Sequence, residues 1–232
     1  IPLANVAVSA GNFKTQTNPK GQYTLKAPQH SVYQLKLKRS GYYDIVHTFS
    51  HYELFNLHAG KPIPDISLVK KEKSRVMLAF AGDVMMGRRY YKPYFDDPVL
   101  ITDIDSLEQS KAIVSHIKPY MALADYAAVN LETQIAEEKP KERAPKSVTF
   151  FSRPNILKAL SWAGVDYVSL GNNHTYDYLD SGLESTLAHL NDSELDYSGA
   201  GETSQQALAA HRERINGQAF SMLGYVGWEG SA

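Results

Sequence analysis

Three short apolar runs, each followed at once by a polar motif, constrain the fold of this chain more than any other feature. The runs occupy residues 76–80, 126–129 and 165–170. Short runs of apolar, β-branched and aromatic residues predict buried strands of a parallel sheet. Because ligands bind at the carboxyl ends of such strands in open α/β sheets, the three polar motifs are expected to meet at one edge.

The polar motifs carry oxygen and imidazole donors. They read Gly82-Asp83-Val84-Met85-Met86-Gly87-Arg88, Asn130-Leu131-Glu132 and Gly171-Asn172-Asn173-His174. Carboxylate, amide and imidazole groups together form the ligand set of a hard or borderline divalent metal ion. His174 has the chemistry of a general acid or an oxyanion stabiliser, and Arg88 that of a partner for a phosphate or carboxylate.

Each of these residues also has a purely structural interpretation. A carboxylate such as Asp83 or Glu132 at the end of a strand can cap a helix or form a salt bridge instead of binding a metal. Arg88 can equally be an ordinary solvated side chain. Asp177 can orient His174 or shape the start of the next helix. The joint occurrence of all three motifs favours the functional interpretation.

The chain divides into two segments with different patterns. The first segment, residues 1–70, predicts short strands at residues 6–8, 23–25, 33–37 and 66–68. Short and closely spaced strands are typical of a small all-β sandwich. A charged linker that begins at Lys70 places the boundary near residue 72, so we expect domains at residues 1–72 and 73–232.

From residue 74 onward, predicted strands alternate with predicted helices. The strands are expected at residues 76–81, 126–131, 165–170, 195–198 and 218–225. Helices are expected at residues 106–125 and 154–162, followed by a third helix that Asp180 or Ser181 caps. This alternation predicts a layered α/β domain with an at least partly parallel sheet.

Charge and composition exclude several classes of chemistry and partner. The net charge of −1 gives no electrostatic reason to expect a nucleic acid as partner. The absence of cysteine excludes disulfides and thiolate chemistry. No apolar run is long enough to span a bilayer, and the residues after Ile1 look like an interior stretch, so we expect a signal or anchor upstream.

In the first segment, one resemblance rests on four stretches. They are Pro2-Leu3-Ala4-Asn5-Val6-Ala7-Val8, Thr15-Gln16-Thr17-Asn18, Gly21-Gln22-Tyr23-Thr24-Leu25 and Gly41-Tyr42-Tyr43. With them the segment resembles the carboxypeptidase regulatory-like domains, small transthyretin-like sandwiches. The resemblance implies an accessory module with no chemistry of its own. His47, His51 and His58 have a helical spacing that would suit a metal, although scattered surface histidines are the simpler interpretation.

A second resemblance extends over residues 76 to about 227. Besides the three motifs, it rests on Phe150-Phe151-Ser152-Arg153-Pro154, Ala163-Gly164, Asp177, Gly199-Ala200-Gly201 and Leu223-Gly224-Tyr225. In this order they resemble the bacterial capsule-synthesis protein CapA family, which is associated with poly-γ-glutamate. That family is similar to calcineurin-like metallophosphoesterases, so the resemblance implies a two-sheet α/β sandwich flanked by helices.

The resemblance also implies roles for single residues. Asp83, Glu132 and Asn173 are the expected metal ligands, and His174 is the expected catalytic histidine. The expected cofactors are divalent ions, Mn, Fe or Zn, as one ion or a pair. Met85 departs from the pattern, because it stands where the superfamily usually has a histidine. The family's further histidine motifs are absent from this sequence, so we expect the metallophosphoesterase-like domain to be C-terminally incomplete, with further ligands beyond residue 232.

Together these features predict a two-domain exported protein. Its expected role is the synthesis, release or transfer of a cell-surface polymer such as poly-γ-glutamate, by metal-assisted hydrolysis or transfer. The expected partners are an anionic polymer or a phosphate-containing substrate and membrane-bound synthase proteins, and the expected location is the periplasm or the cell surface. Two alternatives stay open: a non-catalytic subunit for polymer binding or assembly, and a generic metal-dependent phosphodiesterase unrelated to capsule.

Overall fold

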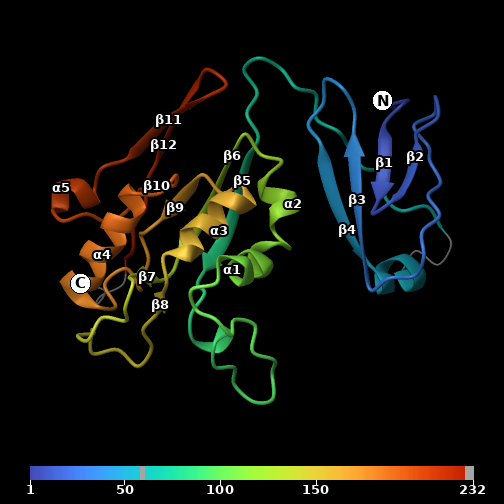
Figure 1. Cartoon of the computed structure of the whole chain (residues 1–232). Helices are drawn as coiled ribbons and strands as arrows, with labels where there is room; N and C mark the ends of the chain where they lie inside the picture. Colours follow the sequence, from blue (N-terminus) through green and yellow to red (C-terminus); the bar gives the residue numbers. More distant parts are fainter. Residues whose placement is uncertain (58–60, 228–232) are drawn as a thin grey trace. The chain divides into compact units, whose positions relative to one another are not determined.

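The computed structural model describes residues 1–57 and 61–227 of the chain. The chain forms two compact units, Ile1–Arg75 and Val76–Ala232 (Figure 1). The sequence pattern places the boundary near residue 72, a few residues earlier.

The first unit is built on one antiparallel sheet in the order β2-β1-β3-β4. Its elements are β1 (Ala7–Ala10), β2 (Phe13–Gln16), β3 (Val32–Lys38), β4 (Ile45–Ser50) and a short π-helix, η1 (Glu53–Leu57). In β3, Tyr33, Leu35 and Leu37 are buried and the residues between them are more exposed, as the alternating pattern predicts. The β character expected for this segment is therefore confirmed in the described residues.

Irregular segments, rather than a second sheet, complete the core of this unit among the described residues. They contribute the partly buried side chains of Leu3, Tyr23, Leu25, Ile63, Ile66 and Leu68. The predicted strands at residues 23–25 and 66–68 are wrong. Pro62 and Pro64 precede the second of these stretches, and proline both lacks the N–H that a sheet ladder needs and fixes φ. The apolar pattern therefore reports burial there without strand pairing.

His47 and His51 do not share a helical face. His47 lies within β4, where its ring contacts Phe49, whereas the His51 ring stacks on Phe55. His58 lies outside the described residues.

The second unit is built on a parallel sheet in the order β10-β9-β6-β5 (Figure 1). Its strands are β5 (Leu78–Val84), β6 (Tyr126–Leu131), β9 (Tyr167–Ser169) and β10 (Asp196–Ser198). β6 is buried along almost its whole length, because it has a neighbouring strand on each side and is covered by other elements. The predicted α/β class is confirmed.

Helices connect the strands of this unit. In its described part they are α1 (Leu107–Val114), α2 (Lys118–Met121), α3 (Asn155–Ala163), α4 (Leu179–Asn191) and α5 (Ser204–Ala207). Gly164 ends α3 in the left-handed conformation, with a φ of 89°, as the sequence predicts.

Two helix predictions need correction. The single helix expected over residues 106–125 is divided into α1 and α2, and Pro119 stands in the first turn of α2, where its missing N–H breaks no intrahelical bond. The next predicted helix begins at Leu179, two or three residues earlier than a cap at Asp180 or Ser181 would place it, and it has no side-chain cap.

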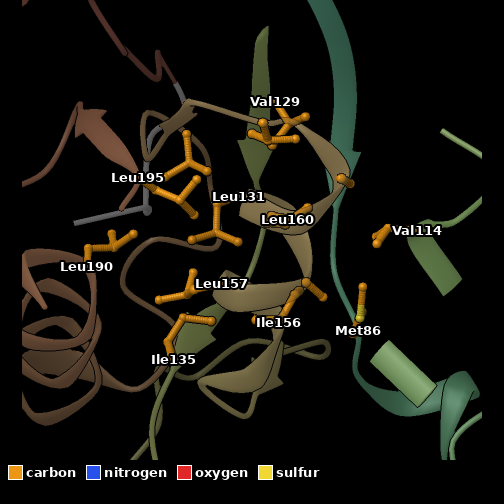
Figure 2. Close-up of a cluster of buried hydrophobic side chains, with 14 of the residues drawn as sticks. Met86, Val114, Val129, Leu131, Ile135, Ile156, Leu157, Leu160, Leu190 and Leu195 are labelled. Atoms are coloured by element: carbon orange, nitrogen blue, oxygen red, sulfur yellow. The ribbon is translucent and has the colours of Figure 1, made fainter. Parts of the chain in front are cut away.

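A buried hydrophobic cluster joins the parallel sheet to α3 and α4 (Figure 2). It includes Val129 and Leu131 of β6, Leu157 and Leu160 of α3, and Leu190 of α4. Burial of each such aliphatic side chain stabilises the fold by about 1.5–3 kcal/mol. The cluster therefore fixes the end of β6 relative to the helices, and with it the polar residues that follow.

Two small sheets and a short 3-10 turn complete the described part of this unit. They are β7 (Gln134–Ile135) with β8 (Phe151–Ser152), β11 (His211–Ile215) with β12 (Gln218–Met222), and η2 (Arg88–Tyr90). Ile215 of β11 packs in one cluster with Tyr126 and Tyr167 of the parallel sheet. Among the described residues, no helix combines the length and apolarity that crossing a bilayer requires.

Candidate metal and catalytic site

The carboxyl ends of β5, β6 and β9 bring the three polar motifs to one place. Asp83 pairs in register with Asn130, and Asn130 pairs with Ser169 near the end of β9. The pairing shifts between Phe80 and Asp83, so β5 carries a β-bulge there. Bulges near functional sites re-aim side chains, and this one brings Asp83 level with Asn130.

Three side chains form a continuous hydrogen-bonded chain across this edge. Asn172 Nδ2 donates to Oδ1 of Asn130 at 3.0 Å, and Asn130 Nδ2 donates to Oδ1 of Asp83 at 2.7 Å. Asn172 also donates to the carbonyl of Leu131 and accepts from the backbone N–H of His174, both at 2.9 Å. Since Asn172 is buried, these bonds satisfy its amide and fix the loop that carries His174.

A fully buried carboxylate, Asp177, holds His174 from the other side. Nδ1 of His174 lies 2.7 Å from Oδ2 of Asp177, and Nζ of Lys146 lies 2.6 Å from Oδ1. Paired with Lys146, the Asp177 carboxylate can only accept, so His174 donates its Nδ1–H. The other ring nitrogen, Nε2, then faces Glu132, whose Oε1 lies 3.8 Å away.

Phe150 stacks against the imidazole and links it to Arg88. The ring centroids of Phe150 and His174 are 4.1 Å apart, and the backbone N–H of Phe150 donates to Asp177. The guanidinium of Arg88 lies 5.9 Å from the Phe150 ring centroid and also contacts Tyr94. Arg88 has a φ of 39°, a conformation that is uncommon outside glycine and recurs at functional sites.

The carboxyl of Glu132 has a shifted pKa. Burial raises the pKa of the Glu132 carboxyl above its ordinary value, and the negative charge of Asp83 raises it further. The positive charge of Lys146, and that of His174 when its ring is protonated, acts in the opposite direction. Two carboxylates that disfavour each other's ionised form favour a bound cation between them.

The donor set suits a divalent metal ion. Asp83 and Glu132 offer carboxylate oxygens, and His174 presents one nitrogen while a carboxylate holds the other, as is usual for histidines at metal centres. Asn173, the expected amide ligand, is half-buried, and its backbone carbonyl accepts from Nζ of Lys146. Ligation by Asp83, Glu132 and Asn173 stays a prediction.

Met85 and Met86 have packing roles. Sδ of Met85 accepts from the N–H of Gly87 at 3.1 Å. Met86 is buried in the hydrophobic cluster, and its N–H donates to the hydroxyl of Ser152. The position where the superfamily usually has a histidine is thus used here to shape the turn before Arg88.

Two contributors to the site were not found from the sequence. Lys146 belongs to a charged, proline-containing stretch that predicts an exposed loop, and Phe150 follows it. Phe150 belongs to Phe150-Phe151-Ser152-Arg153-Pro154, one of the stretches on which the family resemblance rests, so the sequence carries a signal for it, whereas no pattern distinguishes Lys146 from its charged neighbours.

Comparison with known proteins gives a family match. Residues 77–231 match the family described as bacterial capsule synthesis protein PGA_cap. The capsule biosynthesis protein CapA of Bacillus anthracis is 27% identical over 158 residues, which cover 67% of this chain and 36% of that protein. The PGA biosynthesis protein CapA of Bacillus subtilis (strain 168) is 26% identical over 149 residues, 64% of this chain and 36% of that protein. The matched region thus spans about a third of the length of these relatives.

Proposed function

The chain belongs to the PGA_cap family of bacterial capsule synthesis proteins, and from this premise we propose that it acts in the synthesis, release or transfer of a cell-surface polymer. The matched relatives are named for capsule and PGA biosynthesis, which supports poly-γ-glutamate or a related capsule polymer. We place the chemistry in a metal-dependent hydrolase or transferase site at the carboxyl edge of the parallel sheet.

The observation that carries this proposal is a pair of hydrogen-bonded side-chain networks at that edge. One network orients Asp83 through Asn130, and the other fixes His174 through Asp177. Glu132 interacts with both, because its Oε1 lies 3.8 Å from His174 and the charge of Asp83 adds to the burial that raises its pKa. Donors that are held in place before the substrate arrives are what acyl or phosphoryl transfer requires.

Each residue has a proposed role in this chemistry. A divalent ion, Mn, Fe or Zn, held by Asp83, Glu132 and Asn173 would polarise a phosphoryl or acyl oxygen. His174 would exchange a proton with the substrate at Nε2 or stabilise a developing oxyanion. Arg88, beside the stacked phenyl ring, would pair with a phosphate or carboxylate of the substrate.

The proposed substrate is an anionic polymer or a phosphate-containing compound, and membrane-bound synthase proteins are the proposed partners. A polymer of ionised glutamate units is polyanionic, so a cationic group such as Arg88 at the site suits it. The proposed place of action is the periplasm or the cell surface, where a capsule is assembled.

Metal content tests the site. The purified chain is reconstituted with Mn²⁺ or Zn²⁺, freed of excess metal, and subjected to elemental analysis. We expect bound metal in the wild type and less in Asp83→Asn and in Glu132→Gln. Asp65→Asn removes the same charge from an exposed position of the first unit and is expected to leave the metal content unchanged. A content that neither site substitution lowers would contradict the proposed centre.

Turnover separates the proposed function from its alternatives. Poly-γ-glutamate and a simple phosphodiester are offered to the metal-loaded wild type and to His174→Ala. Cleavage or transfer of the polymer that is lost in His174→Ala supports the proposal. Turnover of the phosphodiester alone favours a generic phosphodiesterase, and polymer binding that survives the substitution without turnover favours an assembly subunit.

A further inference from the structure

A second group of metal-ligating side chains lies at the opposite edge of the parallel sheet, where the strands begin. Asp196 is the first residue of β10 and Tyr126 the first of β6, whereas Asp83 lies near the carboxyl end of β5. His211 and Glu213 come from β11. One ligand atom from each of Asp196, His211 and Glu213 lies within 4.8 Å of the other two.

Strand alternation explains why β11 supplies two of these groups. Residues two apart along a strand point to the same face. His211 and Glu213 are partly buried and Ile215 is buried, whereas Arg212 and Arg214 are exposed. The histidine and the glutamate therefore face the parallel sheet, and the two arginines of this strand face away from the cluster.

The distance between Asp196 and His211 suits two ligands of a shared ion better than a direct ion pair. Oδ2 of Asp196 lies 3.3 Å from Nε2 of His211. A charge-assisted N–H···O bond is shorter, about 2.7–2.9 Å. Two ligand atoms bound at about 2.0–2.1 Å to one tetrahedral ion are separated by about 3.3–3.4 Å. The pair is thus already spaced as two ligands of one metal would be.

Tyr126 supplies the outer contact that metal ligands usually have. Its hydroxyl donates to Oδ2 of Asp196 at 2.9 Å and lies 3.3 Å from Nε2 of His211. Hydrogen bonds of this kind fix the orientation of ligating side chains. A further carboxylate, Asp166, interacts electrostatically with Asp196, which adds to the negative potential at this edge. His211 also lines a cavity of about 570 Å³.

We propose that Asp196, His211 and Glu213 form a binding site for a divalent transition-metal ion, with Zn²⁺ as the preferred occupant. A mixed imidazole and carboxylate set suits Zn²⁺ among the common biological metals. Because the ligands come from β10 and β11, the ion ties the β11–β12 ribbon to the parallel sheet and stabilises the second unit. This role is structural, and it is independent of the polymer chemistry proposed for the carboxyl edge.

A Zn²⁺ titration of the whole chain tests this site, with calorimetry and with elemental analysis after gel filtration. His211→Gln and Glu213→Gln are each expected to retain one Zn²⁺ fewer per chain than the wild type and to lose most of the Zn²⁺-dependent rise in melting temperature. Arg212→Gln, on the other face of the same strand, is the matched control. It is expected to retain as much Zn²⁺ as the wild type and to keep the Zn²⁺-dependent rise in melting temperature. Asp83→Asn is expected to keep this ion, so a failure of the carboxyl-edge site gives a different pattern.

The absorption spectrum of the Co²⁺-loaded protein separates loss of metal from loss of folding. Visible bands of a tetrahedral site are expected in the wild type and in Asp83→Asn, and a large loss of intensity is expected in His211→Gln with an unchanged far-ultraviolet circular dichroism spectrum. Equal Zn²⁺ retention in His211→Gln and wild type would overturn the proposal. So would a count that falls only in Asp83→Asn, or a spectrum that His211→Gln leaves unchanged.

Discussion

Nδ1 of His174 lies 2.7 Å from Oδ2 of Asp177, and the second oxygen of that carboxylate pairs with Nζ of Lys146 at 2.6 Å. Oδ2 also accepts the backbone N–H of Phe150, whose ring stacks on the imidazole. One fully buried carboxylate thus joins a histidine, a lysine and the backbone of a separate loop. It is therefore both a positioning group for His174 and a structural tie.

Asp177→Ala is expected to destabilise the chain strongly. The substitution leaves Lys146 without its buried partner and removes an acceptor from His174 and Phe150, so we expect the free energy of unfolding to fall by about 3–5 kcal/mol. Urea denaturation followed by circular dichroism measures the change. Glu142→Gln, an exposed carboxylate in the neighbouring loop, is expected to stay within about 0.5 kcal/mol of wild type. A fall in the free energy of unfolding of under about 1 kcal/mol in Asp177→Ala would contradict this structural role of Asp177.

The adjacent residues Asn172 and Asn173 are expected to behave differently when each is changed to alanine. Asn172→Ala removes a buried amide that bonds Asn130, Leu131 and His174, so the free energy of unfolding should fall by about 1–3 kcal/mol. Asn173→Ala should change stability by less than about 0.5 kcal/mol and lower the retention of Mn²⁺ or Zn²⁺. Unfolding curves and metal analysis of the two variants provide the test, and each serves as the control of the other. Equal stability losses in both would show that Asn173 is structural too.

The sheet edge could be predicted from the sequence because local patterns determine it. The apolar runs before Asp83, Asn130 and Asn172 are dense enough to indicate parallel strands, and parallel strands end at a common edge. The polar residues that follow must therefore meet. The hydrogen bonds from Asn172 to Asn130 and from Asn130 to Asp83 are the physical expression of that pattern.

The contacts made across long sequence separations could not be predicted in this way. Lys146 reaches Asp177, and Tyr126 reaches His211, through tertiary packing that no local periodicity encodes. The strands predicted at residues 23–25 and 66–68 of the first unit are wrong for a related reason. An apolar pattern such as that of residues 66–68 indicates burial and does not indicate backbone pairing. The bulge before Asp83 likewise depends on the register with β6.

Gly171→Ala is expected to disturb the loop between β9 and His174. A Cβ at Gly171 would lie 2.3 Å from the backbone N of Tyr225 and 2.4 Å from the carbonyl carbon of Gly224. Backbone atoms cannot move aside as a flexible side chain can, so we expect a loss of about 1–3 kcal/mol in the free energy of unfolding. Thermal and urea unfolding measure it. Gly82→Ala, where a Cβ would meet nothing within 4 Å, is the control and should keep wild-type stability. Wild-type stability in Gly171→Ala would contradict the close approach.

The raised pKa of Glu132 predicts that, when no metal is bound, the free energy of unfolding of the wild type decreases as this carboxyl ionises. Burial and the charge of Asp83 make the folded chain hold the proton on this carboxyl more tightly than the unfolded chain does. The stability that the protonated Glu132 carboxyl contributes is therefore fully present below the ordinary pKa of a glutamate, about 4.3. It is lost as the pH rises through the pKa that Glu132 has in the folded chain. Glu132→Gln cannot ionise, so it avoids this loss.

In the presence of a chelator, Glu132→Gln should thus be more stable than the wild type at about pH 7.5, and this advantage should shrink at about pH 3.5. Urea denaturation of both proteins at the two pH values measures the difference. Glu142→Gln, on an exposed loop, should show no such pH-dependent advantage. Bound metal should reverse the sign, because a cation stabilises the ionised carboxylate that glutamine lacks. An advantage that is the same at both pH values would show that ionisation of Glu132 does not oppose folding, and would remove the electrostatic argument for a cation beside Asp83.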